Sequence, residues 1–194
     1  MLLCALSNLA IGLIVGAAAL LLIIIICAFI SMRNTLVRLD AACDEAWSTI
    51  DIHLKKRYDL IPNIVETVKG YAKYEGDTLE RVIAARNAAV AAPSPNDKVA
   101  ADNEVTGTLR QLFALTESYP DLKANAQFLS LQTQLQSVET DLAQARKFYN
   151  GKCRELNTRR RTFPSSLVAG KFQARRYFEL DSDEERKNVK VSFN

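Results

Sequence analysis

The strongest constraint on this chain is an uncharged apolar run near its N-terminus. Leu9 to Ile30 reads LAIGLIVGAAALLLIIIICAFI, and the first charged side chain is Arg33. As a helix rising about 1.5 Å per residue, the run spans roughly 33 Å, which matches a bilayer hydrocarbon core of about 30 Å. We therefore expect a single transmembrane helix over about residues 9–30, and this composition excludes a wholly soluble protein.

The residues that flank the run indicate that the anchor is not cleaved, and they also indicate its orientation. The preceding MLLCALSN has no Lys or Arg, whereas a cleaved signal peptide needs a basic n-region and a shorter apolar stretch. Arg33 and Arg38 follow the run, so the positive-inside rule predicts that the N-terminus lies outside and the remainder in the cytoplasm. Residues 1–32 form the predicted membrane anchor.

The rest of the chain is polar and reads as helix. All 25 Lys/Arg and all 22 Asp/Glu follow residue 32, and seven Gly and five Pro are too few for a β-sandwich. Apolar residues spaced by three and four from Leu36 to Ala72 predict one long helix. Pro62 interrupts it, so we expect a kink over 58–61, with a clean break as the alternative.

Three more helices follow in the pattern. The ranges 77–91, 97–118 and 121–161 each show helical periodicity; Asp77 with Glu80 suggests a cap for the first. The last carries a seven-residue seam that places Leu135 and Leu142 in the core. The sequence predicts an all-α protein with a single N-terminal transmembrane helix. An elongated antiparallel four-helix bundle with two long helices follows over residues 33–163, and a short helix and C-terminal tail occupy residues 164–194.

Residues that carry chemistry are few. The lone histidine, His53, favours a helix-surface imidazole over a catalytic one, and no Gly-rich phosphate loop or CxxC pair occurs. The four cysteines are expected to be free thiols. We predict no catalytic residue, no cofactor-binding residue and no metal ligand, and hence a protein that is not an enzyme.

Two features suggest association. Gly12 and Gly16 form a GxxxG spacing that allows a second helix to approach closely within a membrane. Val189, Val191 and Phe193 alternate with polar residues, which fits either a docking peptide that adds to a partner or a frayed end.

Charged residues form several clusters along the polar part of the chain. The acidic pair Asp40 and Asp44 is interpreted as a solvated face, and Trp47 as a core residue. The basic clusters favour membrane lipids over nucleic acid, because no aromatic interleaving accompanies them. These clusters are Lys55–Arg57, Arg159–Arg161, and Lys171 with Arg175–Arg176.

Several stretches are similar to a known family. Asp44–Glu75, Leu115–Asn150, Phe163-Pro164 and YFEL at Tyr177–Leu180 strongly resemble the LemA family of bacterial membrane proteins. The resemblance covers nearly the whole polar domain and implies a helical bundle, described as cytoplasmic, on a membrane anchor. It brings no enzyme activity. The family usually has Gln at the position of His53, so the resemblance assigns that residue no role.

These observations predict a membrane-anchored helical scaffold in the bacterial cytoplasmic (inner) membrane, single-pass, with its N-terminus outside. We expect it to self-associate into a homo-oligomer that organises or shapes the membrane, with membrane lipids as partners, no nucleic acid and no cofactor. The alternative is an adaptor or regulator that presents its bundle to another membrane protein, such as a protease or sensor.

Overall fold

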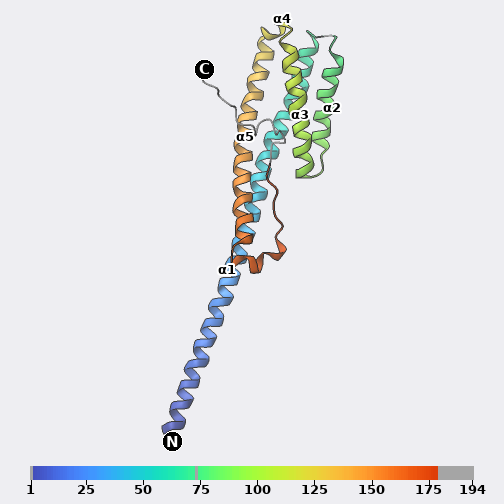
Figure 1. Cartoon of the computed structure of the whole chain (residues 1–194). Helices are drawn as coiled ribbons and strands as arrows, with labels where there is room; N and C mark the ends of the chain where they lie inside the picture. The colour runs from blue at the N-terminus through green and yellow to red at the C-terminus, as the bar shows by residue number, and fades with distance from the viewer. Residues whose placement is uncertain (1, 73, 179–194) are drawn as a thin grey trace, which may run out of the picture. The chain divides into compact units, whose positions relative to one another are not determined.

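The computed structural model describes residues 2–72 and 74–178, with side chains from Gly12 onward. All secondary structure in these residues is helical, which confirms the all-α prediction (Figure 1). The predicted tail residues Val189, Val191 and Phe193 lie outside the described part. The elements are α1 (Leu2–Lys69), α2 (Gly76–Ala91), α3 (Pro95–Thr116), α4 (Pro120–Lys123), α5 (Ala126–Arg161) and the 3-10 helix η1 (Ser165–Lys171).

Helix α1 joins the apolar run to the polar domain without interruption over 68 residues. Its apolar part is the one stretch, within the described residues, that is long and apolar enough to cross a membrane by length and composition. None of that stretch is buried within the structure. The N-terminal part of the chain is therefore compatible with a single membrane span.

Pro62 lies inside α1, so the clean break at this position is wrong. Proline has no N–H for the carbonyl four residues earlier, which belongs to Tyr58. Arg86 of α2 donates a hydrogen bond from Nε to that Tyr58 carbonyl at 3.2 Å. A neighbouring helix thus satisfies the acceptor that Pro62 leaves free.

Side-chain caps decide two of the helix starts. Ser94 Oγ accepts a hydrogen bond from the Asp97 N–H at 3.2 Å and so begins α3. Asn125 Oδ1 accepts from the Phe128 N–H at 2.9 Å, which starts α5 and splits the single helix expected from residue 121 into α4 and α5. The expected Asp77 cap is wrong, because α2 follows Glu75 with no side-chain cap bond.

The chain divides into two compact units. The anchor unit comprises the chain up to Glu45 together with Gly151–Arg176. The core unit comprises Ala46–Asn150 and the segment that starts at Tyr177.

Within the core unit, α1, α2, α3 and α5 share buried apolar faces. Leu135 and Leu142 are 4% and 0% exposed, as predicted from the seam, while the flanking Gln134 and Gln136 are exposed. Trp47 contacts Tyr149, and Arg57 contacts Glu139. Ten residues forward on α1 therefore correspond to ten residues back on α5, so the two helices are antiparallel. This antiparallel pairing is compatible with the predicted bundle.

Within the anchor unit, α1 packs against the end of α5. Cys43 and Cys153 are both fully buried free thiols in hydrogen-bond contact. Arg175 Nη2 lies 2.8 Å from Asp40 Oδ1 and 2.9 Å from Asp44 Oδ1. The predicted solvated face is confirmed for the exposed Asp44, whereas Asp40 is half-buried, and both carboxylates hold one guanidinium.

A buried ion-pair network as the candidate functional site

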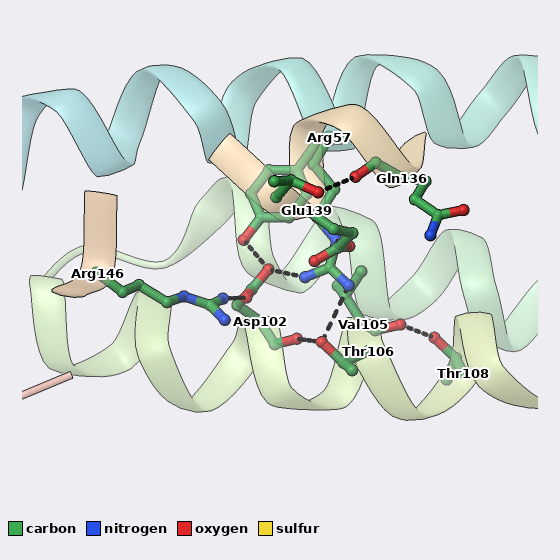
Figure 2. Close-up of polar contacts among 10 residues, drawn as sticks. Arg57, Asp102, Val105, Thr106, Thr108, Gln136, Glu139 and Arg146 are labelled. Atoms are coloured by element: carbon green, nitrogen blue, oxygen red, sulfur yellow. Dashed lines mark hydrogen bonds and ion pairs between the residues drawn. The ribbon is translucent and has the colours of Figure 1, made fainter. Parts of the chain in front are cut away.

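The polar centre of the core unit is the Asp102 carboxylate of α3. Asp102 is 0% exposed, and donors surround both of its oxygens (Figure 2). Oδ1 accepts from Arg57 Nη1 at 2.7 Å and from the Tyr58 hydroxyl at 3.1 Å, while Oδ2 accepts from Arg146 Nη2 at 2.6 Å. A buried carboxylate is tolerated when it is paired in this way, since an unpaired charge would be very costly.

Arg57 connects this centre to two helices. Its side chain is 2% exposed, and its Nη2 donates to Thr106 Oγ1 at 3.0 Å. Thr106 in turn donates to the Asp102 carbonyl at 2.9 Å. On α5, Glu139 Oε1 lies 2.7 Å from Arg57 Nε, an ion-pair contact without hydrogen-bond geometry. The network therefore joins α1, α3 and α5 with two cations and two anions.

Burial shifts the pKa of the groups around Asp102. Desolvation, together with the Asp102 charge, raises the pKa of the Tyr58 phenol, so this group stays a protonated donor. Burial raises the pKa of the Glu139 carboxyl even though Arg57 opposes the shift. Burial likewise lowers the pKa of the Arg146 guanidinium against the opposing attraction of Asp102. Desolvation outweighs attraction at both ends of the network.

An aromatic group closes the network at Arg146. Its guanidinium carbon lies 4.3 Å from the centroid of the Phe178 ring, a cation–π contact. Phe178 stacks on Trp47 at 6.1 Å, and the Asn150 amide bonds the Phe178 backbone in both directions, at 2.7 and 3.0 Å. Trp47, predicted as core, is partly exposed in this stack.

Comparison with known proteins assigns the chain to a family. The LemA family model matches residues 46–193, which include every residue of the network. This chain belongs to the LemA family. It is also similar to Protein LemA of Metamycoplasma hominis, with 26% identity over 167 residues that cover 80% of this chain and 75% of that protein. The resemblance seen in the sequence is confirmed, and the buried network lies in the LemA part of the chain.

The structure places the predicted association and flanking residues on α1. Gly12 and Gly16 are exposed, and a Cβ added at either would meet nothing within 4 Å. Arg33 and Arg38 are exposed after the apolar run. Membrane association of the LemA family agrees with this helix, whereas the orientation of the span and the contact at the glycines stay predictions.

Sequence reasoning missed the network because it assigned Arg57 to an exposed basic cluster. Lys55 and Lys56 are exposed, but Arg57 lies between the buried Leu54 and Ile61 on the apolar face of α1. A charged residue on an apolar stripe is the signal that could have found it.

His53 and the other potential metal ligands do not form a site in the described part of the chain. His53 is partly buried, with Nδ1 at 3.9 Å from Asp141 Oδ2. Within residues 2–72 and 74–178, no group of three or more His, Cys, Asp or Glu side chains could hold a metal ion. The predicted absence of metal ligands and cofactors in the whole chain stays a prediction.

Proposed function

We propose that this LemA-family protein is a membrane-anchored helical scaffold that self-associates and organises or shapes the bacterial inner membrane, without catalytic activity. The observation that carries the proposal is the continuity of α1 from Leu2 to Lys69. A lateral contact between two spans would pass along one helix into the polar domain, with no linker between them.

The buried network supports a structural role for the polar domain. Both Asp102 oxygens are occupied by protein donors, and the side chain has no exposed surface for a substrate. We infer that such a centre fixes which helices pair and in which register, as a buried polar residue does in some coiled coils. The network thereby holds the exposed faces of α1, α3 and α5 in fixed relative positions.

Self-association is proposed to start at the glycine face of the span. Gly12 and Gly16 lie one turn apart on an exposed face with open space beside them. In lipid, close packing of small residues brings helices together, because no hydrophobic effect drives them to associate there. A second contact is proposed for the alternating residues from Val189 to Phe193, which could add to a neighbouring copy.

The test measures the size of the full-length protein in mild detergent by light scattering after size-exclusion chromatography. We expect an oligomer that Gly12→Leu combined with Gly16→Leu makes smaller. Ala18→Leu is the control, since it adds an isopropyl group on the opposite side of the span. Deleting residues 189–194 should reduce the assembly further. A monodisperse monomer of the unaltered protein at every concentration would reject the scaffold hypothesis.

An adaptor role remains the second candidate, and one surface favours it. An open cleft of about 450 Å³ lies between α1 and α2, and apolar residues such as Val65, Leu79 and Ile83 line it. A partner side chain could enter this cleft. An affinity pull-down from native membranes that recovers one membrane protein in a fixed ratio, lost with Leu79→Glu, would favour the adaptor.

A further inference from the structure

The end of α5 and the helix η1 carry an unusual stretch of charge. No acidic residue occurs from Leu156 to Phe178, whereas six basic residues do. Arg175 is held by Asp40 and Asp44, and Arg160 Nε donates to the Phe172 carbonyl at 2.7 Å. Arg159, Arg161 and Lys171 are exposed. The 159–171 segment is therefore a cationic surface of the anchor unit.

The same segment exposes large apolar side chains. Phe163 is 76% exposed and Leu167 is 63% exposed, while Ser165 and Ala169 are buried within the anchor unit. The 3-10 helix thus has one face packed on the protein and the other carrying Leu167 outward. Exposed apolar side chains between arginines and lysine are typical of segments that lie in a membrane interface.

The register between the two long helices gives the height of this segment along α1. Cys153 contacts Cys43, and the helices are antiparallel, so Arg160 on α5 lies level with Leu36 on α1. Figure 1 shows the orange-to-red end of α5 and η1 beside this part of α1. Leu36 is six residues, or about 9 Å along the helix axis, past Ile30, where the uncharged run ends.

That distance brings the segment to the lipid headgroups. The polar region on each side of a bilayer extends about 5–7 Å beyond the hydrocarbon core, and long arginine side chains reach past their own backbone. If α1 crosses the membrane at its apolar run, then Arg159, Arg161 and the adjoining Phe163 lie at the surface of the bilayer.

We propose that the 159–171 segment is a docking surface for anionic phospholipid headgroups of the bilayer that α1 crosses. Phe163 and Leu167 enter the interface, while Arg159, Arg161 and Lys171 bind the phosphates. The proposal rests on the membrane span of the proposed function but not on self-association. Nucleic acid is the weaker partner, because it would leave both apolar side chains in water.

The experiment uses the full-length protein in phosphatidylcholine vesicles, with or without a third of phosphatidylglycerol. Trp47→Phe removes the one native tryptophan, and Phe163→Trp then places a fluorescent probe on the segment. Tyr74→Trp in the same background is the matched control, because Tyr74 is 98% exposed and follows the far end of α1. Circular dichroism checks that each variant is folded, and vesicle flotation checks that it is inserted.

We expect lipids with brominated acyl chains to quench F163W at least about twofold in anionic vesicles, less in neutral vesicles, and to leave Y74W unquenched. Replacing Arg159, Arg161 and Lys171 by Gln should remove the extra quenching. Replacing the exposed Lys56, Arg110 and Lys147 by Gln should not, although it removes the same charge.

Three results would overturn the proposal. Equal quenching of F163W and Y74W would show that the segment does not reach the lipid. Equal quenching of F163W in anionic and neutral vesicles would remove the role of the basic residues. Binding of duplex DNA that depends on Arg159 and Arg161, without a response to lipid, would assign the cations to nucleic acid. A chain that fails to float with vesicles would instead refute the span itself.

Discussion

Asp102 offers the sharpest test of how the polar domain is held together. The change Asp102→Asn keeps the shape of the side chain and removes its charge, which leaves Arg57 and Arg146 facing each other across an amide. Removing one partner of a buried pair typically costs about 3–5 kcal/mol, because the remaining charge stays desolvated. Arg146 loses its ion-pair partner and Arg57 keeps only Glu139, at 2.7 Å from Nε, so we expect a cost within that range.

The assay is thermal unfolding of the full-length protein in mild detergent, followed by Trp47 fluorescence and circular dichroism. A loss of about 3–5 kcal/mol should lower Tm by roughly 6–20 °C in a domain of this size. Asp59→Asn is the matched control, since Asp59 is 55% exposed and pairs with Lys55 at 2.8 Å. Breaking such a surface pair typically costs about 0.3–0.5 kcal/mol.

A compensating variant separates the charge from the general effect of substitution. Replacing Asp102 by Leu together with Arg57 and Arg146 by Met removes both cations and the central anion at once. Apolar replacement of buried charges is often neutral or stabilising, and the remaining Glu139 is 37% exposed to solvent, so this triple variant should regain most of the stability that Asp102→Asn loses. The reasoning fails if Asp102→Asn costs no more than Asp59→Asn, or if the triple variant is no more stable than Asp102→Asn.

Three further predictions concern topology, packing and pH. Protease added to intact spheroplasts should spare the chain after Arg33, and digestion of that domain would refute the N-out orientation. Leu135→Ala and Leu142→Ala should each cost about 2–5 kcal/mol in denaturant unfolding, whereas exposed Gln136→Ala should cost less than about 0.5 kcal/mol; equal losses would mean that neighbouring copies bury both faces. Burial, reinforced by Cys153, raises the pKa of Cys43 from 9.0 to about 12. The unfolded thiol ionises first, so its contribution to stability is full below pH 9 and is lost as the pH rises toward 12. Urea unfolding of Cys43→Ala should show a shallower loss over this window, and an unchanged slope would contradict the assignment.

The helices could be predicted from sequence because their signals are local. Spacing by three and four residues marks the apolar face of each helix directly, and it placed Leu135 and Leu142 correctly. The first residues of α3 and α5 could not be predicted as closely, because one capping side chain determines where each helix begins. Asn125 caps α5 with one hydrogen bond, and the spacing of apolar residues does not predict that α5 begins there.

The apolar stripe around Arg57 signals a buried charge, but the partners in the network could not be predicted because they are distant in the chain. Arg57 meets Asp102 across 45 residues, and Arg175 meets Asp40 across 135. Local sequence shows only a basic run in one place and an acidic pair in another. Which charges pair depends on the order in which the helices pack, and this is a property of the whole fold.

Basic residues that are adjacent in the sequence differ in burial because of helix geometry. Successive residues on a helix point about 100° apart, so Lys55, Lys56 and Arg57 face three directions, and only Arg57 turns into the core. The 159–161 arginines differ because α5 ends there and no acidic residue follows before Phe178. Arg57 forms its ion pairs inside the fold, whereas the side chains of Arg159 and Arg161 are exposed at the surface. Of these arginines, only Arg159 and Arg161 can meet an external anion, and Phe163 lies exposed beside them. We therefore propose the lipid contact at the end of α5.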